Sequence, residues 1–131
     1  MPREMRITTL LERYRQKLIK VLNDSLAWNI VRLPNNSLDL QVKKYCEEIG
    51  EVNEAEEQGD YQHLVEELAD VLICIGGLIR FDEDIAQSAL NDYLATLDKY
   101  IFMDVVDYAE LKIPELYNRD YSDGYHHRER H

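Results

Sequence analysis

Glycine, proline and cysteine are scarce in this chain, whose 131 residues include five glycines, three prolines and two cysteines. Alternation of apolar and polar residues, the mark of a half-buried strand, is also missing, so the sequence disfavours a sheet-rich fold. Cys46 and Cys74 do not have the spacing of a metal-binding motif. We therefore expect two reduced thiols that act as small core fillers, and a cytoplasmic location.

Positive charge is in short supply as well. With 26 acidic and 15 basic residues, the formal net charge is −11. Such a surface repels phosphate backbones, so nucleic acid is not an expected partner. The N-terminus is mixed in charge and does not resemble a secretory signal. The longest apolar run, residues 71–79, is too short to cross a bilayer, so we expect no membrane association.

What the sequence has in abundance is helical periodicity. Apolar residues recur at steps of three and four and predict helices over residues 7–31, 38–58, 61–81 and 85–108. Their expected boundaries are marked by typical capping residues, namely Ser37, Gly59, Asp60 and Asp82. Short connections make successive helices antiparallel neighbours. Residues 1–117 are thus predicted to form one all-α domain of the four-helix-bundle type. We expect Pro114 to interrupt its end and residues 118–131 to be a polar, flexible extension.

Two acidic pairs stand out in the second and third predicted helices, Glu48 with Glu51 and Glu67 with Asp70. Residues three apart lie on the same helix face, so each pair directs two carboxylates to one place. On antiparallel neighbours the four carboxylates converge. Hard divalent cations with oxygen ligands, Mg²⁺ or Mn²⁺, are the natural counter-charge. The alternative is a solvated acidic face without a metal, and the spacing alone leaves both open.

A second pattern concerns assembly. Residues 71–79 are apolar almost all round, and a helix that is apolar on every side must be covered on every side. We therefore expect a subunit interface, and Gly76 and Gly77 would permit close helix approach there. A homodimer or homotetramer would follow. The alternative is a helix at the centre of a single bundle.

Residues 44–52 and 60–73 together resemble the all-α nucleoside triphosphate pyrophosphohydrolases, the MazG-like family. The resemblance rests on a Glu-x-x-Glu motif, a spacer of a dozen or more residues and a Glu-x-x-Asp motif, and it extends over about residues 26–94. It implies a metal-dependent hydrolysis of a nucleoside triphosphate to the monophosphate and pyrophosphate. It also implies a dimer, or a tetramer built from dimers, with four-helix-bundle cores.

The resemblance also assigns residues. It implies that Glu48, Glu51, Glu67 and Asp70 are the Mg²⁺ ligands, and that Trp28 stacks on the substrate base. For Trp28 a core or interface position is the alternative. Metal-bound water needs a general base, for which Glu48 and Glu51 are the candidates.

Three further residues lie on the same helix rows as these acids. Lys44, one turn before Glu48, could reach a substrate phosphate or could simply pair with that glutamate. His63 shares the row of Glu67 and could contact substrate or an ordered water, or be an ordinary helix residue. Cys74 lies in the same row and is expected to pack.

The sequence departs from the family pattern in one respect. A phosphate-contacting lysine is common on the fourth helix of the family, but Asp92 stands at about that position here and Lys99 follows later. This favours, as an alternative function, a non-catalytic interaction or regulatory protein on the same scaffold. A di-iron bundle protein ranks last, because such proteins use Glu-x-x-His pairs, which this sequence lacks.

Overall fold

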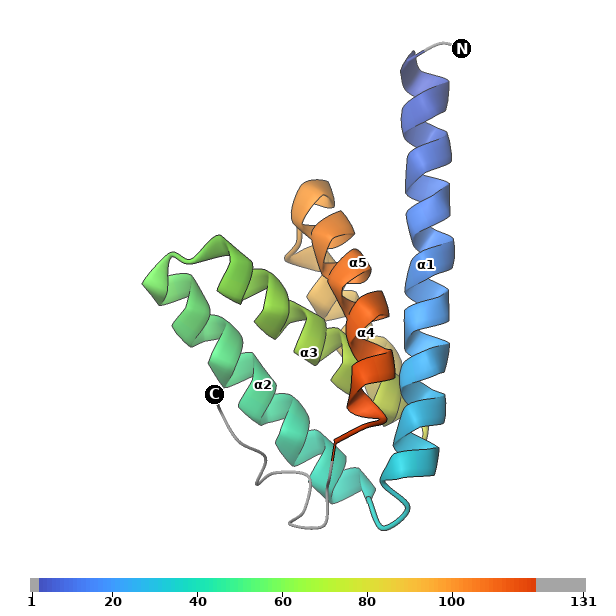
Figure 1. Cartoon of the computed structure of the whole chain (residues 1–131), viewed down its shortest axis with the longest axis vertical. Helices are drawn as coiled ribbons and strands as arrows, with labels where there is room; N and C mark the ends of the chain where they lie inside the picture. Colours follow the sequence, from blue (N-terminus) through green and yellow to red (C-terminus); the bar gives the residue numbers. More distant parts are fainter. Residues whose placement is uncertain (1–2, 120–131) are drawn as a thin grey trace.

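The computed structural model describes residues 3–119, with side chains from residue 12 onward, and within that range every regular element is an α-helix. Five helices follow one another (Figure 1): α1 (Arg3–Arg32), α2 (Leu38–Gln58), α3 (Tyr61–Ile79), α4 (Glu83–Ala95) and α5 (Lys99–Leu116). The predicted all-α class is confirmed. Most of the extension predicted over 118–131 lies outside the described residues.

Local capping chemistry sets the ends of α2, α3 and α4, as the sequence predicts. The Ser37 side chain accepts a hydrogen bond from the Leu40 amide, and the carboxylates of Asp60 and Asp82 cap α3 and α4 in the same way. Gly59 ends α2 with φ at 71°, a left-handed conformation that glycine adopts without a steric penalty. The tight turn at Gly59 makes α2 and α3 an antiparallel pair (Figure 1).

The helix predicted over 85–108 is wrong as a single element. It breaks after Ala95, and α5 begins at Lys99 with Asp98 as a new N-cap that accepts hydrogen bonds from the amides of Tyr100 and Ile101. A continuous helix would place Tyr100 on the packed face, yet 66% of this residue is exposed. The break lets α5 turn back to pack against both α1 and α3, so tertiary packing overrides the continuing apolar period.

Pro114 does not interrupt the chain, contrary to the sequence prediction, but lies inside α5, two residues before its end. A proline ring removes one backbone donor and crowds the preceding turn, and here the exposed Pro114 is tolerated in the last turn. Residues 3–119 therefore form five helices in place of the four predicted.

Helix α3 is the centre of the fold. It contacts α1, α2, α4 and α5, and all eight residues from Val71 to Leu78 are buried. A Cβ atom added to Gly76 would lie 2.5 Å from Ser25 Cβ of α1, so the glycine is what allows this close approach. The all-round apolar stretch is thus covered within one chain, as in the alternative of a central helix, and it no longer requires a second subunit. None of the described helices is long and apolar enough to cross a membrane.

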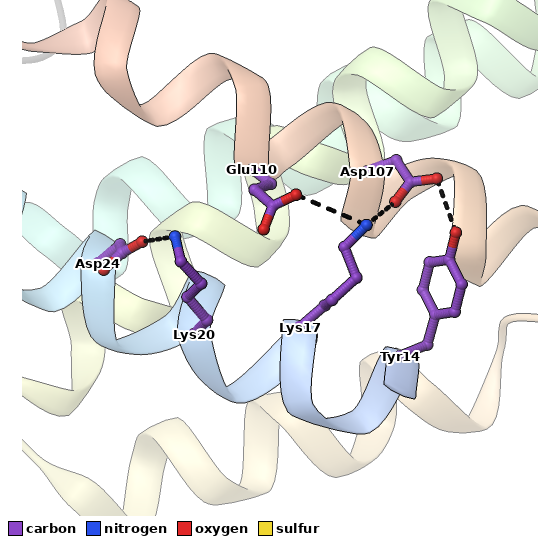
Figure 2. Close-up of polar contacts among 6 residues, drawn as sticks. All are labelled: Tyr14, Lys17, Lys20, Asp24, Asp107 and Glu110. Carbon is purple, nitrogen blue, oxygen red and sulfur yellow. Dashed lines mark hydrogen bonds and ion pairs between the residues drawn. The ribbon is translucent and has the colours of Figure 1, made fainter. Parts of the chain in front are cut away.

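Helix α1 extends beyond the rest of the molecule at its N-terminal end and is held to α5 by polar contacts (Figures 1 and 2). Tyr14 Oη donates a hydrogen bond to Asp107 Oδ2 at 2.8 Å. Lys17 forms ion pairs with the same aspartate and with Glu110, the latter at 3.5 Å. The hydrogen bond to Asp107 raises the pKa of the Lys17 ammonium. These contacts fix one side of α5, whose other side faces α3.

Candidate metal centre

A buried amide fixes the register of α2 against α3. Gln41, fully buried near the start of α2, donates a hydrogen bond from Nε2 to the Cys74 carbonyl oxygen of α3 at 3.0 Å. Its Oε1 accepts one from Asn29 of α1 at 3.1 Å. In an antiparallel pair, two turns forward from Gln41 along α2 correspond to two turns back from Cys74 along α3. Those steps of seven residues lead to Glu48 and Glu67, so this register brings the two acidic motifs together.

Three of the four predicted carboxylates converge. One carboxylate oxygen from each of Glu48, Glu67 and Asp70 lies within 4.8 Å of the other two. Glu48 and Glu67 are buried, and Asp70 is half-buried. Carboxylate oxygens are the ligands that Mg²⁺ and Mn²⁺ prefer, and the group contains neither thiolate nor imidazole. The donor set therefore fits a hard divalent cation.

Each of the three carboxylates also faces a nitrogen. Lys44 Nζ lies 3.1 Å from Glu48 Oε1, and both side chains are at most 3% exposed. His63 Nε2 lies 3.8 Å from Glu67 Oε1. Lys112 of α5 forms an ion pair with Asp70. The Lys44–Glu48 pair is the arrangement that the sequence analysis offered as the alternative to a substrate contact.

Glu51 and Trp28 lie outside the group of three. Glu51 is half-buried one turn beyond Glu48 on α2. Trp28 is on α1, with 2% of the residue exposed, in the apolar core. An indole ring in that position cannot stack on a base unless its surroundings move. The position of Trp28 thus agrees with the alternative given above, an aromatic residue of the core. Its role as a base-stacking residue remains a prediction.

Lys112 is the site residue that the sequence analysis missed. The predicted helix ended near residue 108, which left Lys112 in the tail. On a helix that continues to Leu116, Lys112 lies beside the buried stripe of Ala109, Ile113 and Leu116, and its position there could have been predicted. Tyr108 lies one turn before Lys112 on α5. Burial raises the pKa of the Tyr108 hydroxyl, and the nearby carboxylates of Glu66 and Asp70 raise it further.

A cavity of about 480 Å³ lies between α2, α3, α4 and the start of α5. Apolar side chains such as Ile49, Leu68 and Val71 line much of it, and the three carboxylates do not. Each of these apolar residues is the chain neighbour of one of the three acids. The cavity is therefore adjacent to the carboxylate group but is not lined by it.

Comparison with known proteins identifies the family. The model of the MazG nucleotide pyrophosphohydrolase domain matches residues 37–104, just over half of the chain. The matched segment contains all four predicted metal ligands and Lys44, and excludes Trp28 and Lys112. Comparisons with curated proteins and with solved structures gave no significant match. The chain, with its antiparallel acidic motifs inside the matched segment, belongs to the family of the MazG nucleotide pyrophosphohydrolase domain.

Proposed function

We propose that this protein hydrolyses a nucleoside triphosphate of the (d)NTP type to the monophosphate and pyrophosphate, in a Mg²⁺-dependent reaction for which Mn²⁺ can substitute. The observation that carries the proposal is the convergence of Glu48, Glu67 and Asp70 within the matched family segment. A bound divalent cation would neutralise phosphate oxygens and lower the pKa of a coordinated water.

The carboxylates divide into two roles in this proposal. Glu48, Glu67 and Asp70 hold the cation, and Glu51 completes the ligand set or accepts the proton of the attacking water. Glu51 is the better candidate for the base, because it lies outside the group of three, whereas Glu48 is inside it and paired with Lys44. We keep Lys44 as the candidate phosphate contact and Trp28 as the candidate base-stacking residue. Both are buried here, so substrate binding would have to rearrange their surroundings.

Pyrophosphate release tests the proposal directly. Canonical and modified nucleoside triphosphates are incubated with the protein and Mg²⁺, and pyrophosphate is measured. Glu67→Gln keeps the size of a buried member of the group and removes its charge. Loss of one electrostatic stabiliser should lower turnover by about two to three orders of magnitude. Glu66→Gln is the matched control: it is the same substitution one residue earlier, outside the group, and should leave turnover within a few-fold of wild type.

A non-catalytic helical protein on the same scaffold is the second candidate. Besides Asp92 at the position of the family's lysine, one structural observation favours it: Lys44 and Lys112 already supply positive charge to two of the carboxylates. In that case pyrophosphate release would be absent across the whole panel, and Mg²⁺ or Mn²⁺ would not raise the melting temperature. A cation that binds only the folded state must raise it, so the melting curve separates the two candidates without an assay of turnover.

We also propose that the protein assembles as a homodimer or homotetramer, on the family resemblance alone, since α3 is already covered within one chain. Light scattering at micromolar concentration tests this, and a stable monomer would contradict it.

A further inference from the structure

Lys112 is held next to the carboxylate group because α5 contacts two other helices, α3 and α1. The helix packs on α3, where Lys112 and Asp70 pair with side-chain exposures of only 11% and 14%. Its other side is tied to α1 through Asp107 and Glu110 (Figure 2). The ammonium is therefore positioned by the fold, and it comes from a residue 42 positions away from Asp70 and outside the segment that the family model matches.

The charges at the group explain why such a lysine is useful. Three carboxylates whose oxygens lie within 4.8 Å of one another repel each other strongly when buried. Lys44 and Lys112 each place an ammonium on one of them. Two ammonium groups carry the same total charge as one divalent cation. The chain thus supplies from its own side chains a charge equal to that of the proposed metal.

The two lysines differ in how they relate to a metal. Lys44 is on the same helix as Glu48, one turn away, so local helix geometry sets this pair. Lys112 reaches Asp70 from a different helix and contacts an oxygen of the carboxylate that a cation at the group would share. A cation and an ammonium at one carboxylate repel each other, and a cation at the group would take an oxygen of this same carboxylate as a ligand.

We propose that Lys112 is a counter-ion that competes with the divalent cation for Asp70. Its ammonium neutralises Asp70 when no cation is bound, and it leaves that carboxylate when a cation binds. The inference rests on the proposed function, because it assumes that the carboxylate group is a metal site. It makes Lys112 a positioning residue that sets how tightly the site holds its metal.

Calorimetric titration with Mn²⁺, in the absence of nucleotide, tests the proposal on the full chain. Lys112→Met removes the charge and keeps most of the aliphatic side chain. We expect its Mn²⁺ affinity to rise by about five- to a hundredfold, the usual range for coupling between two binding events. Without metal the variant should melt at a lower temperature than wild type, and Mn²⁺ should raise its melting temperature more than it raises that of wild type.

Two variants control for effects of packing. Lys112→Arg keeps the positive charge, so its Mn²⁺ affinity should stay within a few-fold of wild type. Lys17→Met removes a more exposed lysine–aspartate pair on the other side of α5 (Figure 2). It should lower the melting temperature without changing Mn²⁺ affinity. A purely structural role for Lys112 predicts that Lys112→Met behaves like Lys17→Met.

The outcomes separate this inference from the proposed function. If wild type binds Mn²⁺ and Lys112→Met binds it no more tightly, the counter-ion role is wrong and the metal site stands. Absence of binding in both proteins removes the metal site and the inference together. Binding by Lys112→Met alone supports the inference in its strongest form. If Lys112→Met is unfolded without metal, refolding on addition of Mn²⁺ supports the proposal, and failure to refold overturns it.

Discussion

Substitution of Gly76 by alanine tests the packing of α1 on α3, the contact that holds the centre of the fold. A Cβ atom at this position would lie 2.5 Å from Ser25 Cβ and 2.9 Å from the Leu22 carbonyl oxygen. Carbon atoms in contact are ordinarily about 3.5–4.0 Å apart, so the helices would have to separate by roughly 1 Å. Neither obstacle can rotate away, because one is a backbone atom and the other is bonded directly to the backbone.

The size of the effect follows from two opposing contributions. Overpacking of a tight core contact costs about 1–3 kcal/mol, and we expect the upper end because the neighbouring atoms are fixed. Replacement of glycine by alanine inside a helix returns about 1 kcal/mol. The net loss in the free energy of unfolding should be about 2 kcal/mol, which corresponds to a melting temperature lower by roughly 6–10 °C for a chain of this size.

Gly50 provides the matched control. It lies inside α2, is exposed, and has no heavy atom within 4 Å of an added Cβ. Gly50→Ala should therefore gain the helix contribution alone and raise the free energy of unfolding by about 0.5–1 kcal/mol. Urea denaturation followed by far-ultraviolet circular dichroism measures both variants. The reasoning is refuted if Gly76→Ala is as stable as wild type, since α1 would then not be in close contact with α3.

Two further predictions concern stability around the junction of α4 and α5. Asp98→Ala removes the cap that accepts hydrogen bonds from the amides of Tyr100 and Ile101, and should cost about 1 kcal/mol in urea denaturation; the exposed control Asp92→Ala should change stability by less than about 0.5 kcal/mol. Burial raises the pKa of Tyr93 above its usual value, so above pH 10 the unfolded state loses this proton while the folded state keeps it. Stability should therefore fall as the pH rises past 10, by up to about 1.4 kcal/mol per pH unit from this group. Tyr93→Phe should have a shallower decline, and an unchanged slope would contradict the assignment.

Features that depend on short-range chemistry could be predicted before the fold was known. The caps at Ser37, Gly59, Asp60 and Asp82 are where they were predicted, because a cap involves only the nearest turn of helix. The meeting of the two acidic motifs was also predictable. Spacing of three residues places each pair on one face, and the short turn at Gly59 forces α2 and α3 to be antiparallel.

Features that depend on residues far apart in the chain could not be predicted from local patterns and became visible with the folded structure. The break before Asp98 is not visible in the apolar period, which continues through it, because the break is set by the packing of α5 on α1 and α3. The same packing brings Lys112 to Asp70 across 42 positions. It also covers α3 within one chain, where local pattern alone left open whether a second subunit would do so.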